Sequence, residues 1–279
     1  MEQRRTIVAD VAETAGRSER CACRWMGFHR SAVRYASKRP DDAPLRRRLR
    51  ELAIEHPRWG SPMLTWRLRQ EGWRDNHKRI RRLYRLEGLA VRRRRRKRVA
   101  TPRVPAIPAH RPNERWAMDF MRDTLRGSRA FRALTIVDTC TRECVAIEVD
   151  SSLGGERVVR VLERMAETRG LPRTIVLDNG PEFHSRALDA WAHGRGIELQ
   201  FIRPGKPVDN AFIEAFNGRL RDECLNQHWF LSLADARFTI ERWRVSYNTA
   251  RPHRALKQLT PQQFREQLEH IENLNRLSA

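Results

Sequence analysis

The sequence lacks the features of membrane-spanning and secreted proteins. No apolar run reaches the length of about 18 residues that crosses a bilayer, and the beginning of the chain lacks the apolar stretch of a signal peptide. The five cysteines are scattered, which suits reduced thiols better than a disulfide framework. None of the nine histidines has a zinc-finger spacing near a Cys-x2-Cys pair, so no zinc site is predicted. We expect a cytoplasmic protein without membrane contact.

Acidic residues are scarce beside basic ones, and the imbalance is local. The 279 residues include 56 Lys and Arg against 34 Asp and Glu, a formal net charge of +22. Residues 1–118 hold 32 Lys and Arg against 12 Asp and Glu, net +20, whereas residues 119–279 hold 24 against 22, net +2. Such a charge indicates a polyanionic partner, either nucleic acid or an acidic membrane face. The N-terminal part is predicted to supply most of the affinity for it.

Residues 1–42 are predicted to be helical. The helical pattern of residues 5–36 is broken at Gly16 and Ser18 and again at Gly27, after which Ser31 is the expected N-cap of another helix. A helix, a tight turn and a helix can form a DNA-binding helix-turn-helix, but they are also an ordinary helical hairpin. Both alternatives stay open for this segment.

Residues 43–98 are predicted to form a second helix-turn-helix module, with helices over 45–55, 63–71 and 77–87. Asn76 is the expected N-cap of the last helix, and Gly88 is expected to end it in a left-handed conformation. One face of this helix is apolar and the other is basic. Because clustered cations repel one another unless an anion lies alongside, we predict that Arg79 and Arg82 contact DNA.

A basic run and an irregular linker follow this module. The run is expected to neutralise phosphates without reading base sequence. It consists of Arg92, Arg93, Arg94, Arg95, Arg96, Lys97 and Arg98. Four prolines in residues 99–113 predict a linker without regular structure.

Residues 114–226 have the pattern of an α/β domain. Three short strands come first, over 116–120, 130–137 and 144–149. Helices over 156–168 and 185–193 then alternate with strands over 174–177 and 198–202. We therefore predict a mixed sheet flanked by helices.

Three acidic residues of this domain are candidate metal ligands. Asp119 lies inside a strand, where an unpaired carboxylate is costly, and Asp178 follows a buried strand, where α/β sheets place their sites. Glu214 lies on a helix that begins near residue 209. Carboxylates suit Mg²⁺ or Mn²⁺, and two such ions can support phosphoryl transfer without a protein nucleophile. Position alone leaves open that these are three unrelated acids.

Other polar residues near these three are secondary candidates. Asn210 and Asn217 share the helix of Glu214 and are predicted to contact DNA, and Lys206, in a Gly-Lys-Pro loop, is a candidate phosphate contact. Asp138 is interpreted as a turn residue, while Glu182 could orient Asn179 or a metal-bound water. Three tryptophans are assigned to the core rather than to base stacking, namely Trp116, Trp191 and Trp243.

The sequence motifs around the three acids resemble those of a known family. They are Trp-Ala-Met-Asp-Phe, Asp-Asn-Gly-Pro-Glu-Phe and Asp-Asn-Ala-Phe-Ile-Glu-Ala-Phe-Asn-Gly, with 35 residues between Asp178 and Glu214. The chain resembles the integrase-core transposases of bacterial insertion sequences, specifically the second reading frame product of the insertion sequence three family. The resemblance implies an RNase H-like core with a mixed five-stranded sheet. It also implies that Asp119, Asp178 and Glu214 bind two Mg²⁺ or Mn²⁺ ions and that Arg221 contacts DNA.

The resemblance extends over nearly the whole chain. Residues 45–98 resemble the family's helix-turn-helix module, and residues 227–279, expected to be helical, carry its signature in Tyr247-Asn248, Arg251-Pro252-His253 and Leu259-Thr260-Pro261. It implies a nucleoid-associated bacterial enzyme that nicks double-stranded DNA at element ends and joins the freed 3′-OH to a target. It further implies homo-oligomers on DNA and a fusion or partnership with the first reading frame product.

Two departures and two rival functions accompany this resemblance. Ser61-Pro62 stands where relatives tend to carry an aromatic and a basic residue, and the sequence has no leucine-zipper-like segment. One rival function is a nuclease or junction resolvase that cuts without joining, and the C-terminal signature argues against it. The other is a DNA-binding remnant that represses transposition, and the intact set of three acids argues against that.

Overall fold

The structure of the chain is a computed structural model that describes residues 2–35, 41–91, 109–203 and 210–277. Its contacts divide the chain into Met1–Arg47 and Arg48–Ala279, close to the boundary predicted after residue 42. The predicted basic run 92–98, most of the linker 99–113 and Lys206 lie outside the described residues. None of the described helices has both the length and the apolar character of a membrane span.

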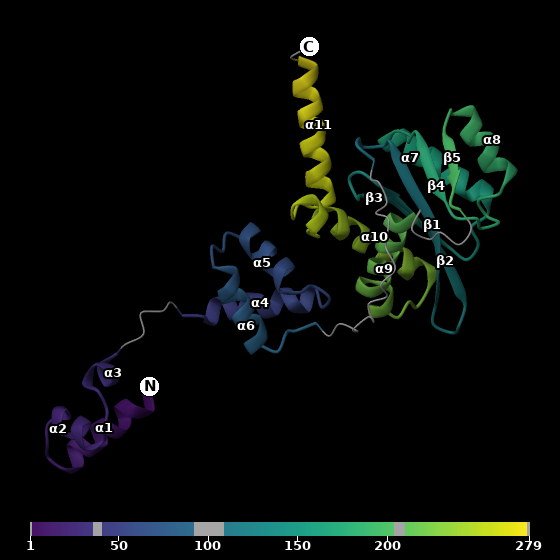
Figure 1. Ribbon diagram of the computed structural model, residues 1–279. Coiled ribbons are helices and arrows are strands. Elements are labelled where there is room, and N and C mark those ends of the chain that lie inside the picture. The colour runs from purple at the N-terminus through teal and green to yellow at the C-terminus, as the bar shows by residue number, and fades with distance from the viewer. Residues whose placement is uncertain (1, 36–40, 92–108, 204–209, 278–279) are drawn as a thin grey trace. The chain divides into compact units, whose positions relative to one another are not determined.

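The first unit contains three short helices, α1 (Glu2–Thr14), α2 (Glu19–Trp25) and α3 (Arg30–Arg34) (Figure 1). They enclose a small core of buried side chains, Val8, Ala22, Cys23 and Val33. The breaks predicted at Gly16 and Gly27 are confirmed, since both glycines adopt positive φ angles of 58° and 66°. The predicted N-cap was wrong: α3 begins after His29, whose Nδ1 lies 2.7 Å from the Ser31 hydroxyl.

The second helical module contains α4 (Ala43–Glu55), α5 (Ser61–Gln70) and α6 (His77–Leu86). Its predicted helices and caps are confirmed. The Asn76 side chain accepts a hydrogen bond of 2.9 Å from the Lys78 N–H, and Gly88 follows α6 with φ of 67°. Ile80, Leu83 and Tyr84 are the buried residues of α6, so its basic residues lie on the outer side.

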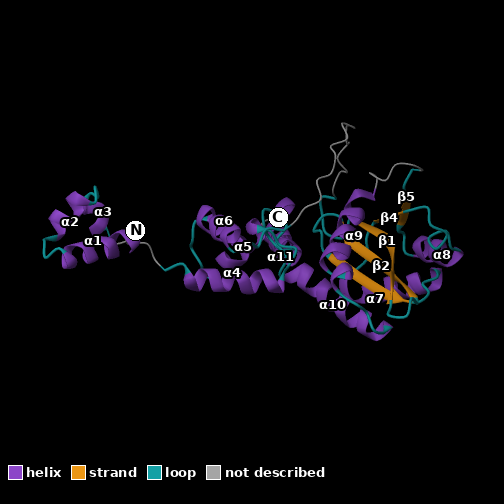
Figure 2. Cartoon of the chain, turned by 90° about the horizontal axis from the view of Figure 1, so that it is seen from below, coloured by secondary structure: helices purple, strands orange, loops and turns teal. Residues whose placement is uncertain are grey.

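A mixed five-stranded sheet forms the centre of the remaining chain (Figure 2). The strand order is β3-β2-β1-β4-β5, in which β1, β2 and β3 are antiparallel and β4 and β5 run parallel to β1. The strands are β1 (Arg115–Thr124), β2 (Ala130–Asp138), β3 (Cys144–Asp150), β4 (Thr174–Leu177) and β5 (Glu198–Phe201). The predicted mixed sheet is therefore confirmed.

Helices cover both faces of this sheet (Figures 1 and 2). On one face, α7 (Gly155–Arg169) and α8 (Arg186–Gly194) pack against alternate strand residues such as Trp116 and Met118. On the other face, α9 (Ala211–Glu223) and α10 (Leu233–Thr249) pack against the intervening residues, such as Ala117 and Met121. Because side chains alternate along a strand, Asp119 shares a face with Ala117 and Met121 and points toward α9.

The first strand is longer than predicted. It continues beyond Phe120 to Thr124, and its last residues pair with Ala130–Ala133 of β2 in a hairpin. Arg122 and Asp123 are polar and were not predicted to belong to the strand, but the hairpin register pairs them with Arg132 and Phe131 of β2. Asp119 therefore lies in the middle of a long strand.

The C-terminal segment is helical, as predicted, and ends with α11 (Pro261–Leu277). Thr260 and Gln263 form a reciprocal cap at its start. The Thr260 N–H donates to the Gln263 side chain at 3.0 Å, and the Gln263 N–H donates to the Thr260 hydroxyl at 3.2 Å. This capping box explains why the Leu-Thr-Pro part of the signature stands at a helix start.

Candidate active site

The register of two parallel strands brings Asp119 and Asp178 together. Trp116 lies opposite Ile175 and Ala117 opposite Val176, so continuing the same register places Asp119 level with Asp178. Strand β4 ends at Leu177 while β1 continues, which leaves Asp178 at the edge where β4 stops. Neighbouring strands lie about 4.8 Å apart, and residues at the same level face the same side. The two carboxylates therefore share the α9 face of the sheet.

Asp119 is held by hydrogen bonds to two of its oxygens. Its Oδ1 accepts from the Phe120 N–H at 2.7 Å, and its Oδ2 accepts from the Asn217 side-chain amide at 2.7 Å. Asn217 is itself fixed, because its Oδ1 accepts from the Thr135 hydroxyl at 2.9 Å. Thr135 is the cross-strand partner of Asp119 on β2. This network ties helix α9 to both strands at the position of the carboxylate.

Helix α9 supplies the third acid. Its buried residues are Ile213, Phe216, Asn217 and Leu220, a spacing of three and four residues that defines one helical face. Glu214 is exposed and stands one turn before Asn217, next to the face that meets the sheet. Phe212 is half-buried, and the Arg142 guanidinium lies 3.8 Å from the centre of its ring.

The pKa of Asp119 depends on the charges of the two other acids. Burial raises the pKa of Asp119 to about 6, and the negative charges of Asp178 and Glu214 act in the same direction. The hydrogen bonds from Phe120 and Asn217 oppose this rise in pKa. Asp178 and Glu214 are thus near enough to Asp119 for their charges to act on it, and ionised Asp119 carries an energetic cost.

This cost predicts that Asp119→Asn stabilises the metal-free protein. The raised pKa means that the folded state holds its proton more tightly than the unfolded state, so wild-type stability is lost as pH rises from about 4 to about 6. The substituted asparagine has no proton to lose, and Asn217 can rotate its amide to pair with it. We expect the variant to gain up to about 3 kcal/mol over wild type above pH 6.

The measurement is thermal unfolding of both proteins in a chelator at several pH values. The stability difference between them should grow between pH 4 and pH 6 and stay constant above that range. If the stability difference between variant and wild type is the same at pH 4 and pH 7, ionisation of Asp119 does not destabilise the folded protein.

The loop after Asp178 is fastened at several points. The Gly180 N–H donates to the Asp178 Oδ1 at 3.0 Å, and the Asn179 amide donates to the Ile202 carbonyl at 2.9 Å. Glu182 forms an ion pair with Arg132 of β2, which lowers the pKa of Glu182. Sequence reasoning left the role of Glu182 open and did not find Arg132, because the two residues are 50 positions apart.

Two asparagines predicted to contact DNA face the protein interior instead. Asn217 is only 8% exposed and bonded to Asp119 and Thr135, and Asn210 is 4% exposed with its amide 3.4 Å from the Met118 carbonyl. Both side chains are therefore held by contacts within the protein, and their contact with DNA stays a prediction. Asp138 is confirmed as a turn residue, because it accepts from the Cys140 and Thr141 N–H groups at 2.8 and 3.0 Å.

The predicted DNA-contacting arginines differ in their surroundings. Arg221 is 43% exposed, and its guanidinium donates to the Arg122 carbonyl at 2.9 Å, on the same side of α9 as Asn217. On α6, Arg79 forms an ion pair of 2.5 Å with Asp75, while Arg82 is exposed. The tryptophans assigned to the core are confirmed: Trp116 and Trp191 are buried, and Trp243 packs against the α9 and α10 cluster.

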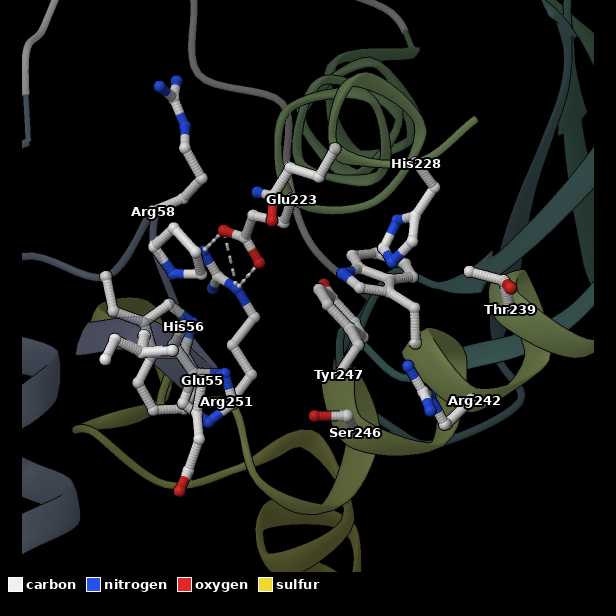
Figure 3. A pocket seen from close by; sticks show the side chains of 15 residues that line it. Glu55, His56, Arg58, Glu223, His228, Thr239, Arg242, Ser246, Tyr247 and Arg251 are labelled. Atoms are coloured by element: carbon white, nitrogen blue, oxygen red, sulfur yellow. Dashed lines mark hydrogen bonds and ion pairs between the residues drawn. The ribbon is translucent and has the colours of Figure 1, made fainter. Parts of the chain in front are cut away.

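The C-terminal signature holds α9 and β3 in place. Asn248 forms two hydrogen bonds of 2.9 Å with the backbone of Cys144, one to its N–H and one to its carbonyl. Arg251 forms an ion pair with Glu223 at the end of α9, and Figure 3 shows the two side chains facing each other. The Tyr247 ring makes edge-on contacts with the rings of Phe216 and His253, at distances of 5.0 and 4.9 Å between ring centres. The signature therefore has a structural function.

The carboxylates do not form a closed metal cluster in the described part of the chain. No group of three His, Cys, Asp or Glu side chains there is drawn together tightly enough to hold an ion. The cavity drawn in Figure 3 is also lined by none of the three carboxylates. The residues nevertheless suit a hard divalent cation, because an ion would offset both the cost of burying the charge of Asp119, which is the main cause of its raised pKa, and the smaller effect of the charges of Asp178 and Glu214.

Comparisons with known proteins agree with this architecture. Two models described as integrase core domain match residues 109–207 and 195–261, and a model described as HTH-like domain matches residues 40–97. The insertion element IS407 uncharacterized 31.7 kDa protein of Burkholderia multivorans is 48% identical over 91% of this chain and 92% of its own length. The insertion element IS476 uncharacterized 39.2 kDa protein of Xanthomonas euvesicatoria is 46% identical over 94% of this chain and 77% of its own length.

More distant relatives give the family and the fold. Transposase InsF for insertion sequence IS3A of Escherichia coli is 26% identical over 74% of this chain and 76% of its own length. A chain of the simian T-cell lymphotropic virus intasome, 16% identical, matches 78% of this chain and 74% of its own length with a TM-score of 0.52, which shows the fold alone. The chain therefore belongs to the insertion-sequence transposases of the insertion sequence three family, with an HTH-like domain followed by an RNase H-like integrase core.

Proposed function

We propose that the three carboxylates form the metal-dependent centre at which this transposase cuts and joins DNA. Asp119 and Asp178, side by side at the sheet edge, and Glu214 on α9 would hold two Mg²⁺ or Mn²⁺ ions. The observation that carries the proposal is the register of β1 and β4, which sets Asp119 level with Asp178 on the sheet face that meets α9, the helix of Glu214. The raised pKa of Asp119, caused first by burial and then by the two neighbouring acids, agrees with it, because a divalent cation would offset the cost of that charge. When bound, such ions activate the attacking oxygen and stabilise the leaving oxygen of a phosphodiester exchange.

The remaining residues of the centre position these carboxylates. Asn217 and Thr135 fix the orientation of Asp119 through two hydrogen bonds of 2.7 and 2.9 Å. The Gly180 N–H fixes Asp178 in the same way. No nucleophilic side chain is required, since water and then a DNA 3′-OH would be the attacking groups. The family resemblance supports this order of cutting and joining.

Strand joining in defined divalent metal tests the proposal. Purified full-length protein is incubated with labelled element ends and a target plasmid, in Mg²⁺, in Mn²⁺ or in a chelator. Joined product in either metal and none in the chelator is the expected result. Cutting without joining would favour the rival nuclease, and end binding without cutting in any metal would favour the DNA-binding remnant.

DNA affinity is proposed to come mainly from the N-terminal part, where residues 1–118 carry a net charge of +20. Within it, the exposed face of α6 presents Arg82. The basic run from Arg92 to Arg98 and Lys206 are proposed as further phosphate contacts, and Arg221 as a contact near the carboxylates. The chain is also proposed to assemble as an oligomer on DNA, and to act in fusion or partnership with the first reading frame product.

Substituting Arg82 by Ala should weaken binding to element ends and make that binding less sensitive to salt. Each lost phosphate contact lowers the slope of the logarithm of affinity against that of salt concentration by about 1. The measurement is fluorescence anisotropy with labelled end DNA across a salt series. Arg164→Ala is the matched control, because Arg164 lies on α7, on the sheet face opposite the carboxylates, bonded to Glu148. Equal salt slopes for all three proteins would refute the assignment of Arg82.

A further inference from the structure

An arginine on β2 links the segments that carry the two aspartates. Arg132 forms an ion pair with Glu182, and their side chains are only 18% and 22% exposed. Glu182 lies in the loop between β4 and α8, four residues after Asp178. Arg132 lies on the strand that pairs with β1, opposite Arg122 in the register. The ion pair therefore ties the Asp178 loop to the antiparallel half of the sheet.

Aromatic contacts extend this link to the strand of Asp119. The Arg132 guanidinium lies 4.4 Å from the centre of the Phe120 ring, and Phe120 immediately follows Asp119. The Phe120 ring in turn stacks on Phe183, at a centroid distance of 4.8 Å. Phe183 is completely buried. Arg132 thus contacts both Phe120, which follows Asp119, and Glu182, which precedes Phe183. These contacts fix the two segments against each other.

A glycine brings the Glu182 carboxylate next to Asp178. A Cβ atom added at Gly180 would lie 3.0 Å from the Asp178 Oδ1 and 3.2 Å from the Glu182 Oε2. The two carboxylates therefore flank the same point, and the missing side chain leaves room for both. Arg132 binds the Oε1 of Glu182 and so offsets a negative charge that would otherwise repel Asp178.

We propose that the Arg132–Glu182 ion pair, stacked on Phe120 and Phe183, is a latch that sets the position of Asp178 relative to Asp119. Arg132 is a positioning residue: it lies on the Phe120 face of the sheet, opposite the face to which Asp119 points. Residues that orient metal ligands in this way change metal affinity by about 10-fold to 100-fold when they are replaced. The inference rests on the proposed function, in which these two aspartates are metal ligands.

The test measures Mn²⁺ binding directly, by calorimetry and by electron paramagnetic resonance on the full-length protein without DNA. We expect Arg132→Gln to weaken Mn²⁺ binding by about 10-fold or more. The Mn²⁺ concentration for half-maximal strand joining should rise by a similar factor, while binding to end DNA is unchanged. Arg132→Lys keeps the cation and should recover part of the affinity. Arg157→Gln is the matched control, because Arg157 of α7 forms an ion pair of 2.7 Å with Glu148 of β3.

The outcomes separate the latch from its alternatives. Normal Mn²⁺ affinity in Arg132→Gln, with or without a lower unfolding temperature, would overturn the latch. So would a loss of affinity in Glu182→Gln that Arg132→Gln does not share, because Glu182 would then be a ligand itself. If Asp178→Asn binds Mn²⁺ as wild type does, the proposed metal centre fails, whatever the result for Arg132.

Discussion

Asp119→Asn, Asp178→Asn and Glu214→Gln are each expected to abolish strand joining, by a factor of about a thousand or more. Each change removes an anionic oxygen from the proposed centre and leaves the side-chain shape nearly unchanged. A loss of this size corresponds to about 4 kcal/mol of transition-state stabilisation, which one metal contact can supply. The measurement is single-turnover joining of labelled element ends in Mg²⁺ and in Mn²⁺.

Binding to element ends should survive these three changes. The carboxylates lie in the part of the chain with a net charge of only +2, so they contribute little attraction to DNA. Asp189→Asn and Glu163→Gln are matched controls, because both residues are exposed helical acids on the α7 and α8 side of the sheet. Near-normal joining by any of the three variants, with both controls active, would remove that residue from the centre.

Local sequence patterns were sufficient to place two of the three candidate metal ligands in or beside strands, although they left open whether the acids form one site. Asp119 inside an apolar strand and Asp178 at the end of another can be recognised from neighbouring residues, and the parallel register then sets them level. Glu214 was placed on the correct helix, but the packing of Asn217 of the same helix against Asp119 was not predicted. A polar residue such as Asn217 is expected at the surface, and only the register of Asp119 with Thr135 shows why it is buried.

Contacts between distant segments account for what the sequence did not predict. Arg132 and Glu182 are ordinary surface-type residues in their local windows, and their pairing depends on how the β4 loop passes the sheet. The C-terminal signature was assigned from resemblance alone. Its structural function depends on Asn248 meeting Cys144, 104 positions away, and on Arg251 meeting Glu223, 28 positions away.

Arg251→Met is expected to lower the free energy of unfolding by about 3–5 kcal/mol. The Arg251 guanidinium donates three hydrogen bonds of 2.6–3.1 Å to Glu223, and the two side chains are 12% and 13% exposed. Removing the cation would leave a carboxylate with little access to water and no partner in this pair. Because Glu223 ends the helix that carries Glu214, strand joining should fall together with stability.

A double replacement separates loss of the charge pair from loss of packing. Arg251→Met combined with Glu223→Leu removes both charges, so most of the lost stability should return. The measurement is thermal and urea unfolding of the metal-free protein, with a decrease of about 10 °C expected for the single variant. Arg164→Met is the control, because its partly exposed pair with Glu148 should contribute no more than about 1 kcal/mol. If the double variant is as unstable as Arg251→Met, packing of the arginine, and not its charge, holds α9 in place.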